Sequence, residues 1–588
     1  MVFITIGILL ISAAGFVSGA AIENALLGDA TGRLSWGPAL FRALLALHGA
    51  VLAACGLHRI LRRAALQPPN ELAARKTTSA RIHLALAGLL GVALVLRLWG
   101  LNSCLWFDEV LTLVTIVRLP PGEIISTFPS QNQHMFYSAL AFLSVSALGE
   151  SAAALRLPSV VFGIASIVAL FLLGRRVVGP QQALLACALV TVSYHHVWFS
   201  QNARGYMGLL FFTLLATWLW MEASSRRRVS WWVAYAVAIA LGAWTHMTMV
   251  FVAAAHALTC AACELPGLLG RRTDRAKSEW RGGLLPAVAA LALAGTLTLQ
   301  LYALSLPEFL QGALNEQSLP SAWTNPLWVV QESVRGLLNV GPIGLTGVTI
   351  GAIVTLAGCV SLFRADRRTA GLMVLPGLLA GATMASLGHN FWPRLFFFCM
   401  GFAVLFVIRG VAILPALLRI GPLRSRLSAA AARRTGLILA GLMVPASASI
   451  LPRCYALPKQ DFIGAREFVE RTRTKDEPVA AAGLAGMAYE MYFASHWANV
   501  QEPAQLERVR AASQRTWMVY TLPIHLRNYH RAIWDVIERD FEVVRVFPGT
   551  LGDGAVTVCR ERTVDPTQSE AAAVRPADHS QETARPRP

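Results

Sequence analysis

Residues 97–109 read Arg97-Leu-Trp-Gly-Leu-Asn-Ser-Cys-Leu-Trp-Phe-Asp108-Glu109. An apolar run over 82–99 is long enough to cross a bilayer, and it ends inside this stretch. Asp108 and Glu109 follow shortly after that end, between aromatic and aliphatic neighbours, so we expect both carboxylates at a membrane interface. Ionisable groups in such a place are costly and usually functional. A solvated pair of acids just beyond a helix end is an equally weighted alternative.

Composition indicates an integral membrane protein. Of the 588 residues, 55% are hydrophobic and 14% are charged, whereas soluble domains have about 25% charged residues. The net charge of +18 does not indicate nucleic-acid binding, because the basic residues fall in short loops at alternate helix ends, as expected from membrane topology. Residues 1–21 are apolar but lack a basic leading region, which favours a first membrane span over a cleavable signal peptide.

The apolar runs predict about 13 transmembrane helices, with every strongly basic loop on the cytoplasmic side. We predict two N-terminal spans and a basic cytoplasmic loop over 1–81, then a transmembrane catalytic domain over 82–451. The first outer loop of that domain covers 101–154 and contains short helices along the interface. The predicted cytoplasmic loops are marked by clustered basic residues at Arg59–Arg81, Arg175–Arg176, Arg226–Arg228, Arg271–Arg281, Arg364–Arg368 and Arg419–Arg434.

The composition changes to that of a soluble domain at about residue 452. Over 452–562 we expect a small extracytoplasmic α/β domain, with strands at 479–482, 517–521, 541–547 and 555–559 and helices at 461–472 and 529–539. Cys454 and Cys559 bracket this domain and could pair in an oxidising compartment. The polar, Ala- and Pro-rich tail over 563–588 is expected to be disordered.

The predicted topology brings polar residues from distant parts of the chain to the outer membrane surface. Each has a structural alternative, such as an arginine that snorkels from a helix end or a tyrosine in an aromatic belt. Together they indicate a site for an anionic lipid head group and for a nucleophile to be activated. The candidates are Asp108, Glu109, His134, Arg156, Arg204, Tyr206, His246 and Arg394.

Several segments resemble, in order, the GT-C glycosyltransferases of family 39, the protein mannosyltransferase-like group that includes the lipid A aminoarabinose transferase. The resemblance covers residues 82–260 and extends more loosely to about 415. The motifs are Arg97-Leu-Trp-Gly-Leu…Trp106-Phe-Asp108-Glu109, Asn132-Gln-His134-Met-Phe-Tyr137, Arg156-Leu-Pro-Ser159, Ser200-Gln-Asn-Ala-Arg204-Gly-Tyr206, Trp244-Thr-His246 and Arg394. The chain departs from the family where Pro is missing after His134, and where Asn202 replaces an acid found in many relatives.

The resemblance implies transfer of a sugar from a polyprenyl phosphate to an acceptor hydroxyl, with inversion, on the extracytoplasmic side. It assigns Asp108 as general base, with Glu109 as a second catalytic residue or as a residue that orients the loop through a cation. His134, Tyr137, Arg156, Arg204, Tyr206, His246 and Arg394 would bind substrate, the arginines through the lipid phosphate.

The sequence also predicts the partners and the location of the protein. No DxD motif or His/Cys cluster dictates a catalytic metal, so we expect no metal and no other cofactor. The expected partners are membrane lipid, the polyprenyl-phosphate sugar and a glycan, lipid or protein acceptor, with no nucleic acid. A bacterial inner membrane with the active site facing the periplasm fits the Ala- and Arg-rich composition.

The main alternative is a flippase or transporter of polyprenyl lipids or sugar lipids, and another is a related protein that has lost catalysis. Against transport, no internal repeat relates the two halves, and the charged residues gather at one face rather than at the bilayer midplane. The sugar could be mannose, another hexose, an aminopentose or arabinose. The acceptor could be a protein hydroxyl, lipid A or a cell-envelope polysaccharide.

Overall fold

The computed structural model of the protein describes residues 1–62, 79–130, 132–226, 228–268, 284–314, 325, 327, 342–417, 428–511, 513 and 515–562. The chain divides into two compact units, Met1–Pro458 and Lys459–Pro588. The predicted disordered tail and much of the predicted basic loops, at 63–78, 269–283 and 418–427, lie outside the described residues.

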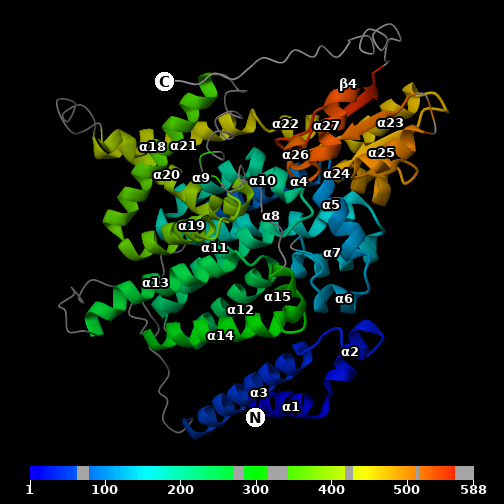
Figure 1. The fold of residues 1–588 in the computed structure, drawn as a ribbon. Helices are drawn as coiled ribbons and strands as arrows, with labels where there is room; N and C mark the ends of the chain where they lie inside the picture. The colour runs from blue at the N-terminus through cyan, green and yellow to red at the C-terminus, as the bar shows by residue number, and fades with distance from the viewer. Residues whose placement is uncertain are drawn as a thin grey trace, which may run out of the picture. The chain divides into compact units, whose positions relative to one another are not determined.

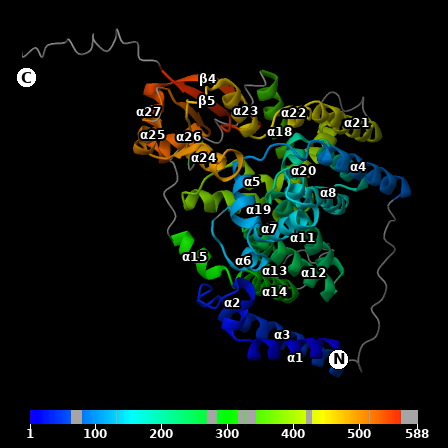
Figure 2. The same ribbon diagram turned by 90° about the vertical axis from the view of Figure 1, so that its right-hand side faces the viewer.

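The regular elements of the first unit are all helices in its described part (Figures 1 and 2). Its helices are α1 (Val2–Phe16), α2 (Gly19–Leu27), α3 (Gly37–Arg62), α4 (Ala80–Leu98), α5 (Phe107–Thr112), η1 (Leu113–Val117), α6 (Pro121–Ser126), α7 (Met135–Leu148), α8 (Ala152–Val177), α9 (Pro180–Thr191), α10 (Tyr194–Ser200), α11 (Tyr206–Arg226), α12 (Val229–Thr245), α13 (Met249–Leu268), α14 (Leu284–Tyr302), α15 (Leu306–Leu314), α18 (Pro342–Ala365), α19 (Arg367–Ser386), η3 (Pro393–Cys399), α20 (Met400–Leu417), α21 (Ala429–Ala448) and α22 (Arg453–Ala456).

Within the described ranges, nine helices are long and apolar enough to span a bilayer, or up to eleven if each of two bent pairs counts as one span. The bent pairs are α1 with α2, at 90°, and α9 with α10, at 64°. The sequence predicted about 13 spans, and two of these coincide with the shorter apolar helices Val229–Thr245 and Met249–Glu264. The predicted fold class, a polytopic α-helical membrane protein with a small C-terminal α/β domain, is confirmed.

Helices α8 and α11 form the centre of the helical unit. They bury 67% and 83% of their most apolar windows inside the protein, whereas α4 and α14 bury 17%. Helix α11 packs between α8 and α12, and α12 packs in turn on α14 (Figures 1 and 2). The peripheral helices therefore present apolar side chains outward, as a lipid environment requires, while most residues of α8 and α11 are packed inside the protein.

Local sequence signals set the helix boundaries around the first outer loop. Gly149 ends α7 with φ of 83°, a backbone conformation that favours glycine. The hydroxyl of Ser151 then caps α8 by accepting from the Ala154 amide at 3.1 Å. At the start of α5, the Trp106 amide donates to Glu109 Oε2 at 3.3 Å, so an acidic residue caps the helix it belongs to.

The second unit contains a five-stranded sheet in the order β2-β1-β3-β5-β4. Strand β1 pairs in parallel with β2 and β3, whereas β5 is antiparallel to β3 and β4. Its elements are α23 (Phe462–Thr472), β1 (Val479–Ala482), α24 (Gly483–Ala488), η4 (Tyr489–Phe493), β2 (Ala498–Val500), α25 (Pro503–Arg510), β3 (Trp517–Tyr520), α26 (Pro523–Tyr529), α27 (Arg531–Asp540), β4 (Phe541–Phe547) and β5 (Val556–Glu561). Cys559 is buried in the core of this unit, and both it and Cys454 are free thiols.

Candidate active site

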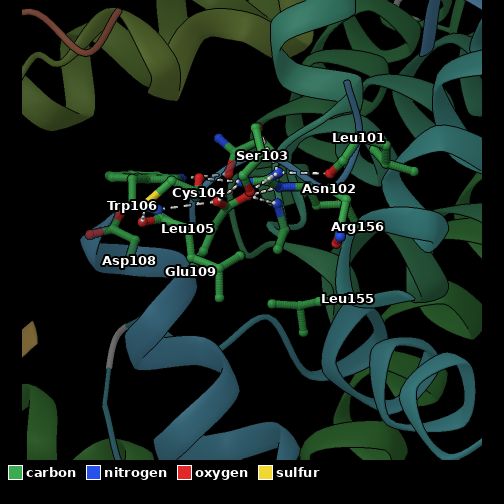
Figure 3. A network of polar contacts seen from close by, with 12 residues as sticks. Leu101, Asn102, Ser103, Cys104, Leu105, Trp106, Asp108, Glu109, Leu155 and Arg156 are labelled. Carbon is green, nitrogen blue, oxygen red and sulfur yellow. Dashed lines mark hydrogen bonds and ion pairs between the residues drawn. The ribbon is translucent and has the colours of Figure 1, made fainter. Parts of the chain in front are cut away.

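The adjacent acids at the start of α5, Asp108 and Glu109, have side chains in different surroundings. The Glu109 side chain is fully buried, whereas the Asp108 side chain is 15% exposed. Both lie in the first helical turn, where carboxylates interact favourably with the helix dipole. Figure 3 shows Glu109 inside a network of polar contacts around Arg156, with Asp108 to one side of it. The two acids therefore have different environments and require separate interpretations.

Glu109 forms a buried ion pair with Arg156. Arg156 Nε donates to Glu109 Oε1 at 2.9 Å and Arg156 Nη2 to Oε2 at 2.5 Å, and neither side chain is exposed. The remaining Arg156 donors bind the first outer loop, at the carbonyls of Leu101 (2.8 Å), Ser103 (2.9 Å) and Cys104 (3.0 Å) (Figure 3). Arg156 thus connects α8 to both the loop and the helix that carry Asp108.

Glu109 also fixes the turn that precedes α11. The Ala203 amide donates to Glu109 Oε1 at 2.7 Å, and Trp106 Nε1 donates to Asn202 Oδ1 at 3.0 Å. From α8, the Ser159 hydroxyl lies 2.6 Å from the Asn202 carbonyl and 3.1 Å from the carbonyl of residue 204. Contacts from α8 and from the start of α5 therefore hold the backbone over 202–204 in place, and with it the backbone from which the Arg204 side chain extends.

Two guanidinium groups approach Asp108. Arg394 Nη1 lies 3.2 Å from Asp108 Oδ2, and Arg204 Nη2 lies 3.9 Å from the same oxygen. Arg204 also donates to the side-chain oxygen of Asn132 and, at 2.8 Å, to its carbonyl. The Arg394 guanidinium lies 3.9 Å from the centre of the Trp392 ring, which orients it by a cation–π contact.

A cavity of about 420 Å³ lies beside these arginines. Its wall combines polar side chains with an apolar surface of aromatic and aliphatic groups, a mixture typical of ligand-binding sites. The lining residues are Phe128, Asn132, Gln133, His134, Arg204, Tyr206, His246, Met247, Thr248, Val250, Phe251, Tyr302, Thr383, Met384, Leu387, His389, Asn390, Trp392, Arg394 and Leu395. Five of the predicted site residues, His134, Arg204, Tyr206, His246 and Arg394, belong to this wall.

Three rings form one side of the cavity. His134 stacks on His246 with ring centres 4.9 Å apart, and Tyr206 lies 5.5 Å from each. Burial lowers the pKa of His246 to about 3, with smaller contributions from Arg204 and Arg394, and burial lowers the pKa of His134 well below its usual range. Both imidazoles are therefore neutral near pH 7, and the fixed positive charge of the wall comes from the arginines.

Several buried polar atoms of the cavity wall lack a hydrogen-bond partner within the described part of the chain. They include Arg204 Nε, Arg394 Nε and His134 Nε2. Such atoms are uncommon in folded proteins and call for a ligand or water. Because two of the three belong to guanidinium groups, the cavity presents donors suited to an anion.

Two predicted substrate-binding residues do not line the cavity. The Tyr137 hydroxyl is buried and donates to the Leu155 carbonyl at 2.5 Å, which ties α7 to α8. Arg156 is occupied by Glu109 and the loop carbonyls, as described above. Conversely, the sequence did not assign roles to Asn132 and Trp392, which hold the two arginines, although Asn132 begins the motif that contains His134 and Trp392 lies two residues before Arg394.

In the described residues, no group of three or more His, Cys, Asp or Glu side chains could hold a metal ion. This finding does not test whether the reaction needs a metal, and metal-independent transfer stays a prediction.

Residues 134–272 match the family model of the dolichyl-phosphate-mannose-protein mannosyltransferases. The resemblance to the protein mannosyltransferase-like group is confirmed. The mannosyltransferase-like segment contains six of the predicted site residues, and Asp108, Glu109 and Arg394 lie outside it. No curated protein sequence matches the chain.

Solved structures of GT-C enzymes are similar to this chain at low sequence identity. ArnT from Cupriavidus metallidurans, bound to undecaprenyl phosphate, is 12% identical, with 82% of this chain and 98% of ArnT covered and a TM-score of 0.44. The oligosaccharyltransferase AglB from Archaeoglobus fulgidus is 13% identical, with 82% and 74% covered and a TM-score of 0.44. The arabinosyltransferase EmbB from Mycobacterium smegmatis is 14% identical, with 71% and 45% covered and a TM-score of 0.43.

Proposed function

We propose that the protein is a membrane glycosyltransferase that transfers a sugar from a polyprenyl-phosphate donor to an acceptor hydroxyl, with inversion and with Asp108 as general base. The active site would face the periplasm from a bacterial inner membrane. The observation that carries the proposal is the position of Asp108 beside Arg204 and Arg394, two arginines that line the cavity and whose Nε atoms have no hydrogen-bond partner among the described residues.

The geometry around Asp108 suits proton abstraction. In the described part of the chain both guanidinium groups approach Oδ2, so Oδ1 remains available to an acceptor hydroxyl. A general base must come within about 2.6–3.2 Å of the oxygen that it deprotonates. The partly exposed Asp108 side chain can meet such an acceptor, whereas the buried Glu109 carboxylate cannot.

The leaving group would be the lipid phosphate, whose negative charge increases as its bond to the anomeric carbon breaks. Arg204 and Arg394 would stabilise that charge, because fixed donors in a cavity with little water are most effective where charge develops. The family model supports a donor of this class, since its description names dolichyl-phosphate-mannose. The polyprenyl chain can stay in the bilayer while its head group occupies the cavity.

The test is a panel of polyprenyl-phosphate sugars, incubated with purified protein, with release of the free polyprenyl phosphate followed over time. We expect release from at least one donor when a suitable acceptor is present. Binding of polyprenyl phosphate without turnover of any donor would instead support the lipid-carrier alternative. The panel includes neutral hexoses, arabinose and an aminopentose, because the sequence leaves the sugar open.

We expect transfer to continue in the presence of a strong chelator such as EDTA. The arginines would supply the positive charge that a divalent ion can supply at a leaving phosphate, so removal of free metal should leave kcat within about twofold. The measurement compares initial rates with and without chelator. Complete loss of activity that Mg²⁺ or Mn²⁺ restores would contradict this expectation.

A further inference from the structure

Arg97 is a fully buried cation on the last turn of α4. Its described partners are backbone carbonyls, one hydroxyl and one imidazole, and the site described above does not include it. The contacts are Nη1 to Ala93 O (3.1 Å) and Thr191 O (3.3 Å), Nη2 to Val190 O (3.4 Å) and His196 Nδ1 (2.7 Å), and Nε to Ser200 Oγ (3.2 Å). A buried charge is tolerated only when its donors are satisfied in this way.

The surrounding residues form a site for this guanidinium. Helix α9 ends where the chain bends by 64° into α10, and the carbonyls at that end point at Arg97. The C-terminus of a helix carries partial negative charge, which favours a cation there. On α8, Gly163 leaves the necessary space, since a Cβ atom at this position would lie 2.3 Å from Ser200 Oγ and 3.4 Å from Arg97 Nε.

Arg97 holds the end of α10 by both its side chain and its backbone. Its Nε donates to Ser200, and its carbonyl accepts from Gln201 Nε2 at 3.1 Å. These residues lead directly into the turn whose backbone ends at Arg204, one of the two arginines beside Asp108. The backbone that leads to Arg204 is thus contacted by Arg97 at residues 200 and 201 and by Glu109 at residue 203.

We propose that Arg97 is a positioning residue that acts through Arg204, and that the fork of its guanidinium group, rather than its charge alone, sets the geometry of the phosphate site. This inference rests on the proposed function. An arginine binds several acceptors in a fixed plane, whereas a lysine offers one flexible ammonium group. Displacement of a binding group by about 1 Å can lower a rate by about 100-fold.

The experiment is a double-mutant cycle between Arg97 and Arg204. Arg97→Lys keeps the charge and removes the fork, and Gly163→Ala forces Ser200 away from Arg97, so either variant tests the inference if the other does not fold. Each is made in the wild-type and Arg204→Gln backgrounds. We measure Kd for undecaprenyl phosphate, kcat and KM for the active donor, and the free energy of unfolding.

We expect both variants to raise Kd and donor KM about tenfold in the wild-type background and less than twofold with Arg204→Gln, because coupled residues are not additive. The matched control is Arg409→Lys. Arg409 also bridges helices, through Ser361 Oγ at 3.1 Å and the Ser361 carbonyl at 3.4 Å, and does not line the cavity. The Arg409→Lys substitution should leave Kd and KM unchanged.

Equal effects in the two backgrounds, or a loss of stability with Kd unchanged, would overturn the inference and leave Arg97 with a structural role only. Failure of the proposed function looks different. A wild-type protein that binds undecaprenyl phosphate but turns over no donor contradicts transfer, while the cycle in Kd still tests Arg97. A wild-type protein that does not bind undecaprenyl phosphate overturns both.

Discussion

Asp108→Asn is expected to lower kcat for sugar transfer at least about 100-fold, because general-base catalysis contributes about 10²–10⁴-fold. The asparagine amide cannot take the proton of the acceptor hydroxyl. The substitution also removes the negative charge that Arg204 and Arg394 face at 3.9 Å and 3.2 Å. Both guanidinium groups then have more capacity for phosphate, so we expect Kd for polyprenyl phosphate to stay the same or to fall. The measurements are release of polyprenyl phosphate and direct lipid binding.

The control for this experiment is Glu123→Gln. Glu123 belongs to the same outer loop and has a similarly shielded side chain (22% exposed), but it faces Arg33 at 3.7 Å, which does not line the cavity, whereas Asp108 faces two arginines that do. We expect the Glu123→Gln protein to transfer sugar at the wild-type rate. If Asp108→Asn kept the wild-type kcat and raised only the donor KM, Asp108 would be a residue that orients the arginines, and the base would have to be sought elsewhere.

The sequence predicted the shared location of the site residues but not their pairing. Asp108 and Arg394 were placed at one membrane face because apolar runs and basic loops are local features, readable in short windows. Which cation meets which carboxylate depends on how helices distant in the chain pack. Arg156 was expected to bind the lipid phosphate, yet it is held by Glu109 and three loop carbonyls. No spacing in the sequence separates these two roles.

The same reasoning explains which elements the sequence missed. The sequence did not predict the bend between Thr191 and Tyr194, where a buried arginine binds the freed carbonyls. A straight helix and a bent one can have the same hydropathy profile, so hydropathy gave no indication of the bend. Strand β2 was also missed, because three residues at a sheet edge, two of them half-buried and one buried, are too few to show alternation. By contrast, β4 was predicted with its observed bounds and the amphipathic helix α27 to within two residues.

Glu109→Gln is expected to lower the free energy of unfolding by about 3–5 kcal/mol, because removal of one partner leaves the other charge buried and unpaired. Arg156 would lose its counter-charge in a place where neither side chain reaches solvent. Glu109 also accepts from the Ala203 amide through Oε1 and from the Trp106 amide through Oε2. Glutamine has only one side-chain oxygen, so either the turn before α11 or the cap of α5 also loses a hydrogen bond. Denaturant unfolding of the purified protein in detergent measures the change.

The chain provides a matched comparison in Glu150→Gln. Arg118 donates to Glu150 at 2.9 and 2.7 Å in the same two-point geometry, but those side chains are 42% and 39% exposed. Exposed pairs contribute about 0–1 kcal/mol, so Glu150→Gln should hardly change the free energy of unfolding.

The contrast between the two variants decides between the two roles that the sequence left open for Glu109. A Glu109→Gln protein as stable as the Glu150→Gln protein, but unable to transfer sugar, would make Glu109 a catalytic partner of Asp108. The expected large loss of stability would instead make Glu109 the residue that joins the Asp108 helix to the turn carrying Arg204.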